Sequence, residues 1–297
     1  MAWRQISVCT DAASAEALSD WFSAQGALSV TLEDAADQPL YEPKPGETPL
    51  WQQTRVVALF EADVDISLLN RKLTAAFGLE RAWQWNVATI EDQAWERAWL
   101  EHFKPMRFGR RLWVCPSSLT LPDEAAGGVC ITLDPGLAFG TGTHPTTALC
   151  LAWLDGLDLH GKSVLDYGCG SGILAVGALL LGSAETIGVD IDPQALLASK
   201  DNAGKNAVAD RLTCCYPEQL PAAWQADVVL ANILANPLVE LAPKLAGHCK
   251  PGGVIALSGL LSEQVEQVSQ AYRPYFRLDP VQYQEGWALV SGIKVVT

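Results

Sequence analysis

Apolar and polar positions follow one pattern through the first 89 residues. Short runs that are apolar, or that alternate between apolar and polar residues, predict strands, and two longer stretches predict helices. The predicted order is strand, helix, strand, strand, helix, strand, at residues 3–9, 14–24, 26–32, 55–60, 66–77 and 83–89, with Ser14 as the cap of the first helix. This β-α-β-β-α-β order predicts a small ferredoxin-like α+β domain, whose sheet has one face covered by helices and one available to a partner.

A different pattern begins near residue 112, where short apolar strands alternate with helical segments. The predicted elements are strands at 112–115 and 128–133, a helix at 146–154, strand–helix units at 163–181, 186–206, 212–223, 227–246 and 253–272, and an antiparallel pair at 281–285 and 288–296. This alternation predicts an α/β domain with a doubly wound parallel sheet and a reversed final strand. Ligands of such sheets bind at the carboxyl ends of the strands.

The two patterns predict domains at residues 1–89 and 112–297, joined by a linker at residues 90–111. A helix is expected over residues 91–103, with Trp95 and Trp99 on one face because they are four residues apart. We expect these two tryptophans to pack within the protein.

Composition narrows the classes of function. The formal net charge of −14 gives no general attraction to nucleic acid, whereas a basic protein would be attracted. Four histidines and eight cysteines without C-x-x-C spacing predict no metal site, and the cysteines fit small core residues in a reducing cytoplasm. The sequence shows neither the apolar region of a signal peptide nor a run long enough to span a membrane. We expect a cytoplasmic protein that is a monomer.

The most informative segment is residues 166–172, Asp-Tyr-Gly-Cys-Gly-Ser-Gly. It joins a short apolar strand to an apolar helix, with the acid Asp166 near the end of the strand and glycines at 168, 170 and 172. Glycines let the backbone approach a ligand because no Cβ intervenes. An acid at this point can anchor an ammonium group, directly or through water. The pattern predicts a site for S-adenosylmethionine.

The main alternative is a dinucleotide site, whose fingerprint is G-x-G-x-x-G at a helix N-terminus. If Gly168 and Gly170 were its first two glycines, the third would have to be residue 173, which is Ile173. Asp166 would also repel a pyrophosphate. A simple strand–turn–helix that needs glycines for its own geometry is the remaining interpretation.

Asp190 supports the cofactor hypothesis, because it ends the next predicted strand. An acid at the end of that strand can accept hydrogen bonds from both ribose hydroxyls of a nucleoside. Asp192 and Pro193 follow it, and they are typical of the cap and first position of a helix.

Asn232 ends the fourth predicted strand and is the candidate catalytic residue. Its amide oxygen can accept a hydrogen bond from an attacking amine, which orients the nitrogen lone pair. Methyltransferases that act on nucleobases or glutamine amides have Pro-Pro and an aromatic residue after this position. Here Ile233, Leu234 and Ala235 follow, which favours a flexible aliphatic amine.

A second segment rich in glycine and threonine, residues 133–147, precedes the helix that leads to the cofactor strand. It lacks the Gly-Lys-Ser/Thr of a phosphate-binding loop. We expect it to cover the cofactor, with Thr147 bonded to the methionine end. His144 is a candidate general base, although a histidine before proline in a loop is more often structural.

Together, residues 133–147, 166–174 and 232–235 resemble the PrmA family, which methylates protein eleven of the bacterial large ribosomal subunit. The resemblance spans the chain and implies a Rossmann-like class I methyltransferase domain preceded by a ferredoxin-like domain that recognises the ribosomal protein. It implies methylation of the α-amine and of lysine ε-amines, with S-adenosyl-L-homocysteine as the second product. The cofactor contacts carried over by position are Thr147, Gly168, Asp190 and Asn232.

Two other functions remain open from the sequence. One is an RNA or small-molecule amine methyltransferase on the same fold, against which the acidic composition and the absence of an aromatic residue after Asn232 both count. The other is a binding protein that retains the fold without the chemistry. A hinge near residues 90–105 is expected if one site is to reach several distant amines.

Overall fold

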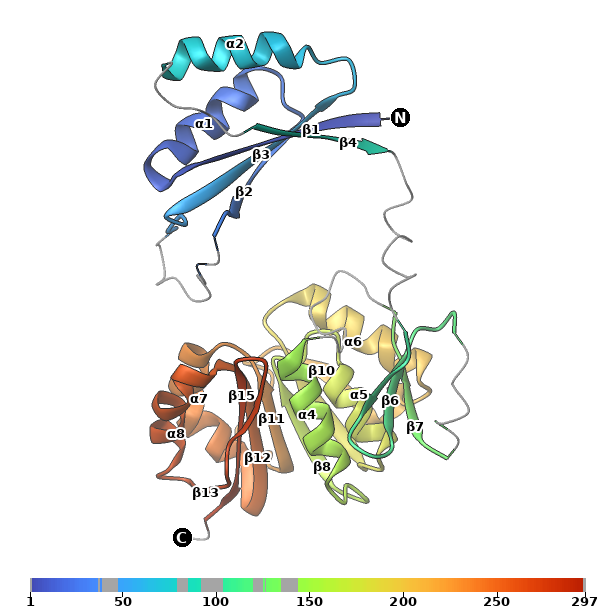
Figure 1. The fold of residues 1–297 in the computed structure, drawn as a ribbon. Coiled ribbons are helices and arrows are strands. Elements are labelled where there is room, and N and C mark those ends of the chain that lie inside the picture. Colours follow the sequence, from blue (N-terminus) through green and yellow to red (C-terminus); the bar gives the residue numbers. More distant parts are fainter. Residues whose placement is uncertain are drawn as a thin grey trace. The chain divides into compact units, whose positions relative to one another are not determined.

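The chain divides into two compact units, Met1–Glu101 and His102–Thr297 (Figure 1). The computed structural model describes residues 2–36, 38, 48–78, 85–91, 104–119, 125, 127–134 and 144–295.

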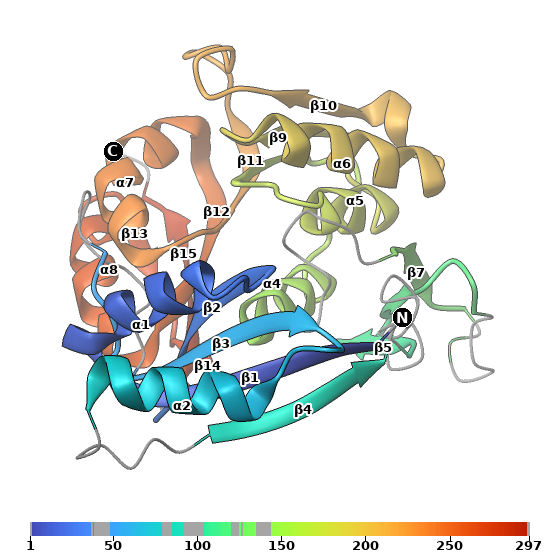
Figure 2. The same cartoon turned by 90° about the horizontal axis from the view of Figure 1, so that it is seen from above.

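The first unit is a four-stranded antiparallel sheet with two helices on one face (Figures 1 and 2). Its sheet order is β2-β3-β1-β4, which is the ferredoxin-like arrangement. The elements are β1 (Ala2–Asp11), α1 (Ala12–Ala24), β2 (Ser29–Asp34), β3 (Gln53–Glu61), α2 (Ile66–Phe77) and β4 (Trp85–Glu91). Alternate residues of β1 and β3, such as Ile6, Val8 and Phe60, are buried against Leu18 and Phe22 of α1.

The cap of α1 differs from the prediction. Asp11, and not Ser14, caps the helix, because its carboxylate accepts the N–H of Ser14 at 2.8 Å. The helix therefore begins two residues earlier, at Ala12. An aspartate at this position satisfies an N–H group that otherwise lacks a partner in the first turn.

The predicted linker, residues 90–111, lies largely outside the described residues, including Trp95 and Trp99. The helix expected at residues 91–103 falls almost wholly on that part, and the described residues 104–111 contain a short strand. Strand β5 (Met106–Phe108) pairs with β6 (Leu112–Cys115), which in turn pairs in parallel with β7 (Val129–Thr132). Asp155 fixes the turn between β5 and β6, because its carboxylate accepts the backbone N–H groups of Arg110 and Arg111.

The second unit is built on an eight-stranded sheet with the order β10-β9-β8-β11-β12-β15-β13, to which β14 adds by pairing with β15. The strands β8 to β12 are parallel, and β15 runs antiparallel to all three strands with which it pairs, as the sequence predicts for a reversed final strand. The strands are β8 (Ser163–Tyr167), β9 (Glu185–Val189), β10 (Leu212–Cys215), β11 (Ala226–Asn232), β12 (Cys249–Leu261), β13 (Phe276–Leu278), β14 (Gln282–Gln284) and β15 (Trp287–Lys294).

Helices cover both faces of this sheet. They are α4 (Pro145–Asp155), α5 (Ile173–Leu180), α6 (Pro193–Lys205), α7 (Ala235–His248) and α8 (Val265–Tyr272). Successive residues of β8 face opposite sides, since Leu165 and Tyr167 pack in one core with Leu238 of α7, while Asp166 between them bonds to α5. Figures 1 and 2 show α7 beside α8, on the other side of the sheet from α5.

The register of the sheet brings the candidate residues together. Strand β8 lies between β9 and β11, with Tyr167 opposite Val189 and Asp166 opposite Leu230. Their carboxyl ends therefore meet at one edge, from which the glycine turn, Asp190 and Asn232 all follow.

Candidate functional site

Glycines 168, 170 and 172 all adopt positive φ angles, of 82°, 53° and 76°. An L-residue with a side chain pays roughly 1–2 kcal/mol for this left-handed conformation, which explains the alternation of glycines. The turn is bound to the neighbouring strand, because the N–H groups of Gly168 and Cys169 both donate to the carbonyl of Val189, at 2.7 and 3.0 Å.

Asp166 is fully buried beneath this turn. Its Oδ2 accepts the N–H of Ala175 in the first turn of α5, at 3.1 Å, and so supplies the capping interaction that Gly172 lacks a side chain to make. Its Oδ1 is buried with no hydrogen-bond partner among the described residues. Burial raises the pKa of Asp166 to about 7, with the Ala175 N–H opposing the rise and the Asp190 carboxylate adding to it. A buried acceptor without a partner favours a donor or cation from a ligand.

Asp190 is bonded to the same turn. Its Oδ2 accepts the N–H of Gly170 at 2.9 Å, and its Oδ1 accepts the N–H of Asp192 at 3.0 Å. Each carboxylate oxygen retains a second lone pair, which leaves capacity for a pair of hydroxyl donors. Asp192 caps α6 by accepting the N–H of Gln194, as the sequence predicts.

Two side chains of α6 bind the backbone of the glycine turn, which the sequence analysis did not predict. Ser199 donates its hydroxyl to the carbonyl of Gly170 at 3.0 Å, and Asn202 donates its amide to the carbonyl of Ser171 at 2.8 Å. Both side chains are buried. A Cβ on Gly172 would lie 2.8 Å from the Ser199 hydroxyl, so helix and turn are in close contact. In the sequence, Ser199 and Asn202 are simply two polar residues three positions apart in a predicted helix.

The structure brings Thr147 and Asn232 together across 85 residues of sequence. The amide nitrogen of Asn232 lies 3.4 Å from the hydroxyl of Thr147, a long hydrogen bond. Thr147 is fully buried in the first turn of α4, and Asn232 ends β11. The amide nitrogen can only donate, as it does to Thr147, so the amide oxygen is the group that can accept a hydrogen bond from a ligand.

Ile233 connects this edge to the glycine turn. A Cβ on Gly168 would lie 2.2 Å from the Cγ2 of Ile233, and a Cβ on Gly259 would lie 2.3 Å from its carbonyl oxygen. The segment after β11 is thus held between two glycines, and Gly259 is a site residue that the sequence analysis missed. The N–H of Ile233 also donates to the carbonyl of Ser258, at 3.2 Å.

The Gly/Thr-rich segment is described only at its two ends, since residues 135–143 lie outside the described residues. At its second end, His144 caps α4, with its Nδ1 2.8 Å from the Thr146 hydroxyl. The His144 ring also packs edge-on against Trp287, with centroids 4.7 Å apart. Burial lowers the pKa of His144, against the effect of Glu285. These contacts give His144 a structural role.

Among the described residues, no group of histidine, cysteine or acidic side chains could hold a metal ion. All eight cysteines are unpaired thiols. No helix within the described ranges is long and apolar enough to cross a membrane.

The arrangement fits S-adenosylmethionine. The buried Asp166 oxygen without a hydrogen-bond partner matches a ligand ammonium group, and the turn that follows it carries glycines at 168, 170 and 172. Asp190 is placed at the end of β9 with lone pairs available to a ribose. When bound, this cofactor supplies an electrophilic methyl group.

Comparison with known proteins identifies the family. A family model described as ribosomal protein L11 methyltransferase (PrmA) matches residues 2–294. Proteins named ribosomal protein L11 methyltransferase from Hahella chejuensis and Methylococcus capsulatus are 57% and 55% identical, over 98% of this chain and 98% and 99% of theirs. The crystal structure of a ribosomal protein L11 methylase from Lactobacillus delbrueckii subsp. bulgaricus matches with a TM-score of 0.58 and 28% identity, over 65% of this chain and all of that one. The chain is an S-adenosylmethionine-dependent methyltransferase and belongs to the ribosomal protein L11 methyltransferase (PrmA) family.

Proposed function

We propose that this protein methylates ribosomal protein L11 on its α-amine and on lysine ε-amines. The observation that carries the proposal is the structure around Asn232, at the carboxyl end of β11. Its amide is oriented by Thr147, and the following residues Ile233 and Leu234 are aliphatic. Leu234 is 46% exposed, which suits contact with the hydrocarbon stem of a lysine better than stacking on a planar base. The relatives' names supply the identity of the substrate.

Asn232 acts by positioning. Its amide oxygen accepts an N–H of the substrate amine and so turns the lone pair toward the methyl group. Asn232 does not titrate, so the amine must lose its proton before it reacts. A lysine has a pKa near ~10.4 and an α-amine near ~8, and a dry site beside a positive charge lowers both values.

The proposed cofactor-binding residues surround this edge. Asp166 receives the ammonium group, and Gly168, Gly170 and Gly172 admit the methionine part. Asp190 receives the ribose hydroxyls, and Thr147 and Asn232 complete the methionine end. The proposal is supported by the common strand edge that these residues share and by the Asp166 oxygen that has no protein partner.

We further propose that residues 1–89 recognise the ribosomal protein, that residues 90–111 form the flexible connection, and that residues 112–297 carry out the reaction. A formal charge of −14 favours a basic protein substrate over RNA. The eight free thiols are in keeping with a reducing cytoplasm. We propose that the enzyme acts there as a monomer.

The test is an assay with methyl-labelled S-adenosylmethionine and two separate pools of acceptor, unmethylated ribosomal proteins and bulk RNA. We expect label only in the protein pool, on a single ribosomal protein. Asn232→Ala is the matched control, because it should lose transfer of label far more than it loses cofactor affinity. Label in RNA alone would overturn the proposed substrate while leaving the cofactor site intact.

A further inference from the structure

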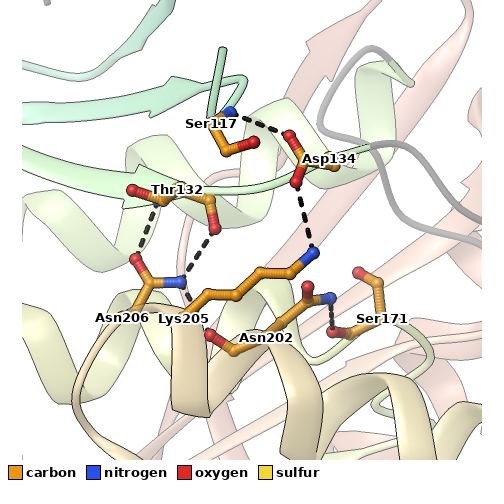
Figure 3. Close-up of polar contacts among 7 residues, drawn as sticks. All are labelled: Ser117, Thr132, Asp134, Ser171, Asn202, Lys205 and Asn206. Carbon is orange, nitrogen blue, oxygen red and sulfur yellow. Dashed lines mark hydrogen bonds and ion pairs between the residues drawn. The ribbon is translucent and has the colours of Figure 1, made fainter. Parts of the chain in front are cut away.

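Helix α6 and the residue that follows it carry three polar side chains in a row. Ser199, Asn202 and Asn206 are three and four residues apart, so their side chains project in similar directions. The first two hold carbonyls of the glycine turn. Asn206, which follows the last residue of the helix, contacts a different part of the unit (Figure 3).

That contact is the end of strand β7. Asn206 accepts the N–H of Thr132 on its Oδ1 and donates its amide to the carbonyl of Thr132, both at 2.8 Å. Strand β7 is the outer strand of the three-stranded sheet, so its outward edge has no neighbouring strand among the described residues. The Asn206 amide therefore takes the place of a paired strand at this one residue.

The same amide is linked to the glycine turn by two separate hydrogen bonds, which meet at Asn202. Asn206 Nδ2 also donates to the backbone carbonyl of Asn202 at 2.8 Å, and the side chain of Asn202 donates to Ser171. Figure 3 shows this path from Thr132 through the two asparagines to Ser171. Beside it, Asp134 pairs with Lys205 at 3.2 Å and accepts the N–H of Ser117 at 2.8 Å.

Closure of the helix does not account for the two bonds between Asn206 and Thr132. The left-handed position that favours glycine or asparagine is the next one, and Ala207 occupies it with a φ of 56°. Backbone bonds from Val208 to Ala203 and from Ala207 to Gly204 close the helix, and the Asn206 amide adds a bond to the Asn202 carbonyl. Its other two bonds reach out of the helix to Thr132.

One end of this path lies in the proposed cofactor site, because Ser171 belongs to the glycine turn, and the other lies at Thr132, the last residue of β7. We propose that Asn206 is a positioning residue: by fixing the end of α6 against β7, it holds Asn202 in place against the glycine turn, so that cofactor affinity depends on it. Asn206 itself touches neither cofactor nor substrate. This inference rests on the proposed cofactor-binding residues but not on the identity of the methylated substrate.

The test measures binding of S-adenosylhomocysteine by calorimetry in the wild type, Asn202→Ala, Asn206→Ala and the double variant. Loss of the Asn206 hydrogen bonds should weaken binding by about tenfold. Because the two asparagines act as a unit, the double variant should lose clearly less than the product of the two single losses. Gln225→Ala is the matched control, since it removes an exposed amide hydrogen bond to Gly247 remote from this network, and its affinity should equal that of the wild type.

Hydrogen exchange distinguishes coupling from local damage. In Asn206→Ala, amides of residues 169–174 should exchange faster, as well as those near Thr132. Asn206→Asp, which keeps the acceptor for the Thr132 N–H but loses both donated bonds, should resemble Asn206→Ala in the glycine turn. Unchanged affinity in Asn206→Ala, losses that multiply in the double variant, or faster exchange confined to Thr132 would overturn the inference. If the wild-type protein did not bind S-adenosylhomocysteine, both the proposed cofactor site and this inference would be wrong.

Discussion

The Cγ2 of Ile233 occupies the space that a side chain on Gly168 would need, 2.2 Å from the position of its Cβ. One residue belongs to the cofactor turn and the other follows the candidate catalytic residue. Packing between them fixes the distance between the two halves of the site, so a change in either should be felt by both.

Gly168→Ala should therefore lower cofactor affinity by roughly 10- to 100-fold, because the added methyl group displaces Ile233 and forces a left-handed alanine. Adding Ile233→Ala should recover part of the loss by removing the clash, while the backbone strain of about 1–2 kcal/mol remains. Titration of S-adenosylhomocysteine against both variants gives the comparison. If Gly168→Ala alone bound with wild-type affinity, the packing of Ile233 against Gly168 would not contribute to cofactor binding.

The Thr147 hydroxyl should matter for turnover more than for binding. Thr147→Val removes the partner of the Asn232 amide and lets the amide rotate, which should lower kcat on the order of tenfold. Asn232→Ala should lower kcat further, by about 100-fold or more, with a smaller change in cofactor affinity. Thr147→Ser keeps the hydroxyl and serves as the control, so a loss in Thr147→Ser equal to that in Thr147→Val would contradict the role assigned to the hydrogen bond.

Asp166 should make cofactor binding depend on pH. The pKa of its carboxyl is raised to about 7 in the protein alone, so the group is protonated below that pH. A ligand ammonium group binds the ionised form, and binding below pH 7 must therefore release a proton. Affinity should fall by up to about tenfold for each pH unit below 7, until the lower pKa of the bound form is reached.

Calorimetry with S-adenosylhomocysteine from pH 5 to 8, in buffers with different heats of ionisation, measures both the affinity and the released proton. Asp166→Asn should bind the cofactor more weakly and lose the pH dependence.

In the protein without cofactor, pH acts on folding stability in the opposite direction to its effect on cofactor affinity. The folded state holds this proton more tightly than the unfolded state, so the Asp166 contribution to stability should decrease as pH rises from about 4 to 7. If cofactor affinity did not change between pH 5 and 8, the proposed contact between Asp166 and the ammonium group would be excluded.

The left-handed Ala207 predicts a stabilising substitution. Ala207→Gly should raise the free energy of unfolding by about 0.5–1 kcal/mol, because relief of strain exceeds the added freedom of the unfolded chain. The same change within α6, Ala198→Gly, should lower it by about 1 kcal/mol. Chemical denaturation of the two variants measures these opposite signs, and destabilisation by both would mean that Ala207 is not strained.

The sequence was sufficient for groups placed by local order. Asp166 lies next to the end of β8, and the alternating glycines and Asp190 follow strand ends, so parallel strands bring all of them to one edge whatever the details of packing. Asp192 as a helix cap is equally local. The cap of α1 was misassigned to Ser14, because aspartate and serine both cap helices and the pattern alone did not decide between positions three residues apart.

Contacts between segments could not be predicted in the same way. Ser199 and Asn202 appear in the sequence as ordinary polar residues of a helix, and only the packing of α6 under the glycine turn gives them carbonyl partners. Gly259 gave no signal, because its need for a small residue arises from Ile233, 26 positions earlier in the chain. Thr147 and Asn232 were each identified, but the hydrogen bond between them depends on α4 packing beside the end of β11.

The most direct test of the account is tandem mass spectrometry of purified, unmethylated ribosomal protein L11 after reaction with this enzyme and S-adenosylmethionine. The account predicts methyl groups on the α-amine and on lysine ε-amines, and at least about 100-fold slower methylation at the same positions with Asn232→Ala. Methyl groups on side-chain amides, arginines or carboxylates, or an unmodified protein despite measured cofactor binding, would contradict the assignment of this site to aliphatic amines.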